Sequence, residues 1–264
     1  MTDFPRTEVG GLSLSRLIVG SNWFLGFSHC SEAKSQFIKD HFSDWRLIAD
    51  VLEVFFNAGV DTVMGHAVWE NYRNAITEAE QRTGRKAKFI STPGFPFNRE
   101  TPAKGFDMDE VKRILDQDLE AGADIVMPHQ SVTDAMVDRC TREIRHMPQI
   151  CAAIRERGLI PGLSTHMPES IIYADETELD VEIYISIYNN MGFLMQVEVD
   201  WVSSIIRNAK KPVLTIKPMA AGQVRPFQAF TFVWNTIRPQ DMVAAGTMTP
   251  NEAREVIELS TAIL

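Results

Sequence analysis

The chain has 264 residues, of which 45% are hydrophobic and 23% are charged, as in an ordinary globular protein. Its formal net charge of -9 argues against nucleic acid or an anionic membrane surface as a partner, since both attract basic proteins. The sequence has no signal-peptide core and no stretch of roughly 20 apolar residues, and its 3 cysteines form no Cys-x-x-Cys pair. We therefore expect a cytoplasmic protein that binds a small-molecule substrate. The oligomeric state stays open.

Short apolar runs typical of β-strands alternate with helical stretches along the whole chain. The expected strands are Leu17–Asn22, Asp61–His66, Lys88–Thr92, Asp124–His129, Leu159–Thr165, Val181–Tyr188, Val213–Lys217 and Asp241–Gly246. The clearest helices are Asp44–Ala58, Asp107–Ala121, Pro148–Arg157, Leu194–Lys210 and Pro250–Leu264. Because no polar linker interrupts this alternation, we predict an α/β protein in which residues 1–264 form a single (β/α)8 TIM barrel.

The first residues predict an additional element before the barrel. The segment from Thr7 to Gly20 has the pattern of a small β-hairpin that turns at Gly10 and Gly11 and leads into the first strand. We expect this N-terminal β-hairpin to cover the end of the barrel opposite the active site.

Three of the 6 histidines each end an apolar run that is typical of a strand. They are His66, His129 and His166. In a parallel barrel the carboxyl ends of the strands share one rim, and active sites form there. Alternation with Thr62 and Met64 points His66 into the barrel. The sequence therefore predicts a pocket lined by three imidazoles.

Several segments resemble the aldo-keto reductase superfamily, especially its shorter bacterial members. They are the hairpin, Gly162-Leu-Ser-Thr-His, Tyr188-Asn189 and Ile216-Lys-Pro-Met-Ala-Ala-Gly, and they span nearly the whole chain in order. The resemblance implies a barrel that binds a nicotinamide near Ser164 and Thr165 and reduces a carbonyl. In that family a tyrosine donates the proton, a lysine and an aspartate lower the pKa of the tyrosine, and a histidine orients the carbonyl.

The catalytic residues of that family are mostly replaced. A gapless alignment puts Met64 at the aspartate, Trp69 at the tyrosine and Pro93 at the lysine, whereas His129 keeps the histidine position. None of the three replacements can donate a proton to an alkoxide. This degenerate tetrad argues against a standard reductase.

The residues that would bind NADP after the last strand also differ from those of the family. Gly246, Glu252 and Val256 fall where the family has the lysine, arginine and asparagine that bind NADP. A carboxylate there repels a phosphate. Thr249 still predicts a good helix start, where a phosphate could rest on free amides, and Arg254 lies one turn further on. We expect NAD(P)H to bind weakly or not at all.

The favoured cofactor is a divalent metal, with NAD(P)H as the alternative. His66, His129 and His166 are the candidate ligands, since neutral imidazoles suit zinc, manganese or iron, and a carboxylate from Glu70 or Glu198 would complete the site. The open alternative is that the histidines are ordinary rim residues bonded to backbone or water.

Other candidate residues follow the same strand ends. Lys217 could form a Schiff base, although a scaffold role is the simpler interpretation. Candidate substrate-binding residues are Asn22, Trp23, Tyr188, Asn189 and Arg225. The aromatic-rich segment Trp23–Trp45 is either a lid over the rim or a packed helical insertion.

Three functions remain open. We favour an enzyme of the lyase, aldolase, isomerase or hydrolase type that acts on a small polyhydroxy or oxo compound, with His129, His66 and Lys217 as catalytic residues. The first alternative is an NAD(P)H-dependent reductase with an unusual proton donor, and the second is an inactive binding barrel. The fold by itself does not decide among them.

Overall fold

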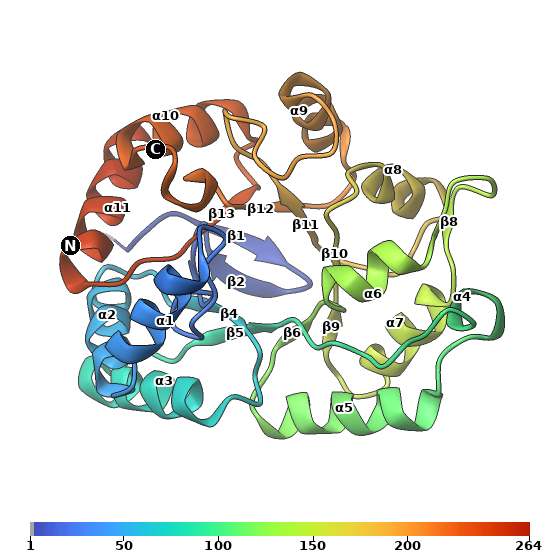
Figure 1. Ribbon diagram of the computed structural model, residues 1–264, viewed down its shortest axis with the longest axis horizontal. Coiled ribbons are helices and arrows are strands. Elements are labelled where there is room, and N and C mark those ends of the chain that lie inside the picture. Colours follow the sequence, from blue (N-terminus) through green and yellow to red (C-terminus); the bar gives the residue numbers. More distant parts are fainter. Residues whose placement is uncertain (1–2) are drawn as a thin grey trace.

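The computed structural model describes residues 3–264 and consists of a ring of parallel strands enclosed by helices (Figure 1). The ring contains β3 Leu17–Gly20, β4 Thr62–Gly65, β5 Lys88–Ser91, β6 Ile125–Val126, β9 Ile160–Pro161, β10 Leu163–Ser164, β11 Tyr184–Ile187, β12 Val213–Ile216 and β13 Met242–Ala245. The sheet order is β10-β11-β12-β13-β3-β4-β5-β6-β9. Since β9 and β10 are consecutive halves of one strand, the ring is the closed (β/α)8 barrel that the sequence predicts.

The closure occurs at Gly162, between β9 and β10. Its N–H donates to the carbonyl of Val126 on β6 at 3.0 Å, and the next N–H, of Leu163, donates to Ile183 on the opposite side at 2.9 Å. A Cβ at Gly162 would lie 2.7 Å from Cγ2 of Ile183 and 2.8 Å from Cε of Met127. Any larger residue at the point where the strand changes partner would therefore force Ile183 and Met127 to shift.

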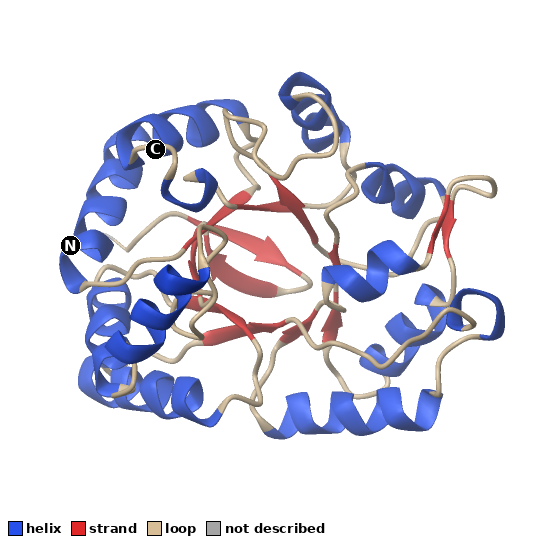
Figure 2. Ribbon diagram, viewed as in Figure 1, coloured by secondary structure: helices blue, strands red, loops and turns tan. Residues whose placement is uncertain are grey.

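The N-terminal hairpin closes the floor of the barrel, as predicted. Strands β1 Arg6–Val9 and β2 Leu12–Ser15 pair antiparallel, and Gly10 and Gly11 turn with φ of 56° and 86°. Gly10 packs against Ile160 at the start of β9. The hairpin crosses the centre of the ring in Figure 2, and Val9 and Leu14 join the apolar cluster inside the barrel.

The helices cover the outside of the ring. They are α1 Glu32–His41, α2 Arg46–Asn57, α3 Glu70–Thr83, α4 Thr101–Lys104, α5 Met108–Glu120, α6 Gln130–Ala135, α7 Met147–Arg155, α8 Glu169–Glu176, α9 Val199–Asn208, α10 Pro226–Thr236 and α11 Pro250–Ile263, with a short 3-10 turn at Ala220–Gly222. A small hairpin, β7 Val137–Asp138 with β8 Glu143–Ile144, precedes α7. No helix in residues 3–264 is long and apolar enough to span a bilayer.

Residues 23–45 form a packed helical insertion, and residues 27–31 form its exposed tip. Phe24, Ile38 and Phe42 are each at most 5% exposed, and the rings of Phe24 and Phe42 meet edge-on at 5.3 Å. The tip bends toward the segment after β12, where Cys30 Sγ lies 3.0 Å from the carbonyl oxygen of Ala221. The insertion thus combines a fixed base with a cover at the edge of the rim.

Candidate active site

His66 and His129 lie close together at the carboxyl end of the barrel. Met64 and Met127, two residues earlier on each strand, belong to the inner apolar surface, and the alternation carries both imidazoles inward. The ring centroids are 6.1 Å apart. Trp69 stacks on His66 at 5.5 Å. Burial lowers the pKa of His66, so this imidazole is neutral at pH 7.

The tautomer of His129 is set by its own helix start. The N–H of Ser131 donates to Nδ1 of His129 at 3.3 Å, and Oγ of Ser131 lies 2.8 Å from the same nitrogen. Because Nδ1 accepts the amide hydrogen, the ring proton resides on Nε2. The backbone N–H of His129 is held by Pro93 at the end of β5. His129 therefore offers a fixed Nε2–H donor.

Lys217 reaches the same rim by an unusual route. Val213 packs outside the barrel and Leu214 inside, so regular alternation would send Lys217 outward. Instead its backbone has φ of +59°, a left-handed conformation that costs a lysine about 1–2 kcal/mol. Its Nζ lies 3.3 Å from Nε2 of His29, on the tip of the insertion.

Burial lowers the pKa of Lys217 to about 8. The sequence offered no sign of this shift, and a catalytic role of Lys217 stays a prediction. His29 is a site residue that the sequence analysis did not select. It lies in an irregular loop rather than at a strand end, and only the length of the loop after β3 pointed to it.

His166 is near the positive charge of Lys217. Burial first, and then the charges of Lys217, His129 and His29, lower the pKa of His166 to about 4. The same ammonium, after burial, lowers the pKa of His29 and contributes to the lowered pKa of His129. The imidazoles of His29, His129 and His166 thus lie within Coulombic range of one amine.

Asp134 fixes the strand end that carries His166. Its Oδ1 accepts a hydrogen bond from Oγ1 of Thr165 at 2.6 Å, and its Oδ2 accepts from the backbone N–H of His166 at 3.1 Å. Thr165 is fully buried and faces α6, and the cofactor contact that the resemblance implies for it stays a prediction. Ser164, on the opposite face of the strand, is 6% exposed.

Two predicted substrate-binding residues, Tyr188 and Asn189, are buried, and their contact with a substrate stays a prediction. Tyr188 is 1% exposed and packs outside the barrel against Phe232 of α10, with centroids 5.0 Å apart. Strand alternation with Tyr184, which also packs outward, is the reason. Asn189 is buried, and its side chain bonds to the loop that follows β11. Its Oδ1 accepts hydrogen bonds from the backbone N–H groups of Met191 and Phe193.

The remaining candidates lie at the edge of the rim. Asn22 is exposed, and Trp23 is half-buried with the ammonium of Lys34 5.6 Å from its ring centroid. Arg225 is exposed immediately before α10. All three are on loops that follow strand ends, and none contacts the histidines through a hydrogen bond in residues 3–264.

The helix start after β13 is occupied by its own side chains. Thr249 Oγ1 accepts from the N–H of Glu252, and the carboxylate of Glu252 accepts from the N–H of Met248 at 2.6 Å. This reciprocal capping uses amides that a phosphate would need. Arg254 is exposed and bonds to Asn251. The weak binding of NAD(P)H stays a prediction, as does any contact from Arg254.

The metal site also stays a prediction. In the part of the chain that the structure describes, no group of three or more His, Cys, Asp or Glu side chains is arranged to hold a cation. Binding through Nε2 of His129 would further require its ring proton to leave Nε2, against the hydrogen bond from Ser131. Glu70 and Glu198 are both exposed.

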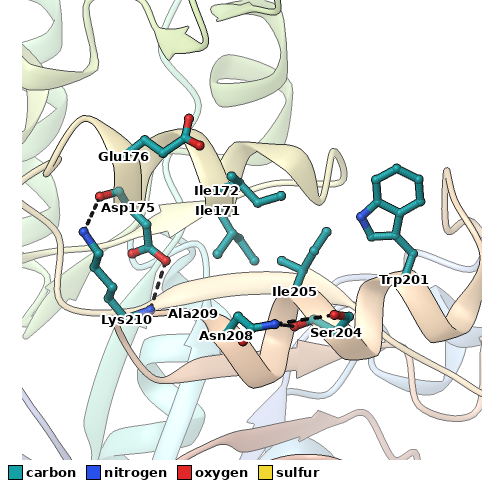
Figure 3. A pocket seen from close by; sticks show the side chains of 10 residues that line it. All are labelled: Ile171, Ile172, Asp175, Glu176, Trp201, Ser204, Ile205, Asn208, Ala209 and Lys210. Carbon is teal, nitrogen blue, oxygen red and sulfur yellow. Dashed lines mark hydrogen bonds between the residues drawn. The ribbon is translucent and has the colours of Figure 1, made fainter.

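A groove outside the barrel is a separate feature. It has a volume of about 370 Å³ between α8 and α9, with Ile171, Ile172 and Ile205 on its floor and the exposed ring of Trp201 at one end (Figure 3). At the other end Lys210 bonds to Asp175. None of the rim histidines lines this groove.

Comparison with known proteins identifies the fold. No family model and no curated protein sequence matches the chain. A protein from Pseudomonas aeruginosa assigned as an aldo-keto reductase has 17% identity and a TM-score of 0.69, covering 100% of this chain and 98% of that one. An aldose reductase from Giardia lamblia has 11% identity and a TM-score of 0.57, with coverage of 99% and 89%.

A different enzyme class is also similar in structure. Orotidine 5'-monophosphate decarboxylase from Methanocaldococcus jannaschii has 14% identity and a TM-score of 0.54, covering 93% of this chain and 98% of that one. Such identities establish the architecture alone. The chain therefore has the barrel fold of the aldo-keto reductases along its whole length, as its sequence motifs indicate, and shares this barrel type with enzymes of unrelated chemistry.

Proposed function

We propose that the protein is a lyase or aldolase that forms an imine between Lys217 and a small oxo compound at the rim. The observation that carries this proposal is the amine itself. Lys217 is half-buried, forms no ion pair with a carboxylate of residues 3–264, and is held in a left-handed conformation next to three imidazoles. A lysine drawn away from solvent usually pairs with a carboxylate, and backbone strain of this kind gathers at functional sites.

The lowered pKa makes this amine a usable nucleophile. With a pKa of about 8, roughly one lysine in ten is neutral at pH 7, compared with fewer than one in a thousand for an exposed lysine. The neutral amine attacks the carbonyl carbon, the carbonyl oxygen leaves as water, and a C=N bond forms. The imine then accepts the electron pair of a carbon–carbon bond that breaks next to it.

The histidines supply the proton transfers that these steps need. His129 presents Nε2–H, which can protonate the carbonyl oxygen as it leaves. His66 is neutral and 6.1 Å away between ring centroids, so it can accept a proton from the substrate side. Trp69 stacks on His66, and the exposed ring of Phe27 lies 5.9 Å from Trp69 between centroids, so an aromatic surface extends from His66 toward solvent.

Borohydride trapping tests the proposal. The protein is incubated with a set of small aldehydes, ketones and oxo acids in the presence of cyanoborohydride, and intact mass and peptide mapping locate the adduct. We expect one adduct, on Lys217, and none in Lys217→Met. The matched control is Lys112→Met, which removes an exposed lysine on α5 and should leave trapping unchanged. Adducts spread over exposed lysines, or none at all, would refute the imine.

The fold favours a second candidate, a nicotinamide-dependent reductase. The Nε2–H of His129 can orient a carbonyl in that chemistry too. Titration with NADPH separates the two candidates, because saturable binding in the micromolar range with hydride transfer to a carbonyl would support the reductase.

A further inference from the structure

Five basic residues gather at the rim, whereas the chain as a whole has a net charge of -9. Burial lowers the pKa of each of these five basic groups, namely His29, His66, His129, His166 and Lys217, although His29 is exposed at the tip of the insertion. No carboxylate in residues 3–264 opposes these shifts. Asp134 touches the backbone of His166, but its oxygens are committed to Thr165 and to that backbone. A negative charge beside Lys217 would therefore meet no carboxylate of the described residues other than Asp134.

Hydrogen bonds already orient one of these donors. The ammonium of Lys217 donates to Nε2 of His29, so the ring proton of His29 resides on Nδ1. The His29 ring meets the ring of Phe193 edge-on, with the two centroids 6.5 Å apart. Phe193 lies on the loop after β11. His166, at the end of β10, is within the field of both Lys217 and His29. The two imidazoles come from different loops; His29 contacts the amine directly, and the charge of the same amine acts on His166.

We propose that the substrate carries an anionic group beside its carbonyl, as an oxo acid or an oxo phosphate does, and that His29 and His166 bind that group next to Lys217. The carbonyl part of this inference rests on the proposed function, whereas the anion site rests on the arrangement of the basic residues. An anion held here replaces the missing carboxylate and favours the protonated imidazoles. A cationic substrate would be repelled by the same groups.

A histidine titration by NMR tests the anion site without turnover. The probes are oxamate, a carboxylate whose amide carbonyl forms no imine, and inorganic phosphate. We expect a saturating probe to raise the pKa of His166 by about one unit, since each unit corresponds to ~1.4 kcal/mol of preferential binding to the charged form. His41 and His146 lie outside the rim cluster and serve as internal controls in the same spectra. Tighter binding of oxamate indicates an oxo acid, and tighter binding of phosphate indicates an oxo phosphate.

The outcomes separate this inference from the proposed function. In Lys217→Met, which forms no imine, both probes should still shift His29 and His166, although more weakly. In a protein that keeps Lys217, His166→Gln should raise the Kd of oxamate by about tenfold, whereas His146→Gln should leave that Kd unchanged. If neither probe shifts the rim histidines, or if all six shift equally, the anion site is refuted, even where neutral ketones are trapped on Lys217. If the probes bind but no oxo compound is trapped, the imine alone fails.

Discussion

Replacing Lys217 with methionine should make the protein more stable at neutral pH. Methionine keeps an unbranched stem at the same backbone position and removes the ammonium. Burial lowers the pKa of that ammonium from 10.5 to about 8, and a shift of this size corresponds to about 3 kcal/mol. Solvent reaches part of the half-buried group, and the bond to His29 offsets about 1 kcal/mol. We therefore expect a net gain of about 1 kcal/mol at pH 7.

The pH dependence of this gain is the sharper test. The pKa of Lys217 is lower in the folded than in the unfolded state. The charged lysine therefore lowers the free energy of unfolding by its full amount below about pH 8, and this loss disappears as the pH rises to the unfolded pKa of 10.5. Urea unfolding of the wild type and of Lys217→Met should therefore give free energies of unfolding that converge between pH 8 and 10.5. Lys112→Met should show no such convergence, because that side chain is exposed in both states. A variant that is less stable at pH 7, or a gain that is the same at every pH, would refute the depressed pKa.

Three further outcomes are expected. Gly162→Ala should lower the free energy of unfolding by about 2 kcal/mol, measured in urea, because the new Cβ would lie 2.7 Å from Ile183; an unchanged value would mean that the strand relaxes. The wild type should lose stability as the pH falls from 6.5 to 4, since the pKa of His166 is lowered to about 4, and His166→Gln should lose about 2 kcal/mol less over that range; equal slopes would contradict the burial of that imidazole. NADPH should cause no saturable change in tryptophan fluorescence at micromolar concentrations, because Glu252 occupies the amide of Met248; a micromolar Kd would show that this cap is displaced.

Periodicity was enough to predict the barrel. Each of the eight expected strands contains or overlaps a strand of the ring, and the Gly10-Gly11 turn is the floor hairpin. These elements depend on local patterns of apolar residues and turn glycines, which a single sequence displays. The division of one strand into β9 and β10 was not predicted, because it depends on which neighbours Gly162 contacts across the ring.

The site was predictable only where strand alternation continues to the last residue. Alternation holds for His66 and His129, since Met64 and Met127 face inward. Tyr184 faces outward, so the same alternation places the ring of Tyr188 outside the barrel. Its position at a strand end had instead suggested that it lines the active site. For Lys217 alternation fails, because a positive φ reverses the direction of the side chain. His29 belongs to no strand, so only the packing of the insertion brings it to the rim.

The two-part construction of residues 23–45 has a consequence for motion. The base is fixed by Phe24, Ile38 and Phe42, whereas the contacts of the tip with the segment after β12 are the bond that Lys217 donates to His29 and the bond that Cys30 donates to Ala221. Opening the tip breaks these two bonds and the contacts of Phe27 with Trp69 and of His29 with Phe193, while the apolar base stays packed, so its opening free energy is a small fraction of that of global unfolding. Amide hydrogens near residues 27–31 should exchange with solvent much faster than those in the middle of α1. A substrate can thus enter and leave through a local fluctuation of a few residues while the barrel and the helical base stay in place.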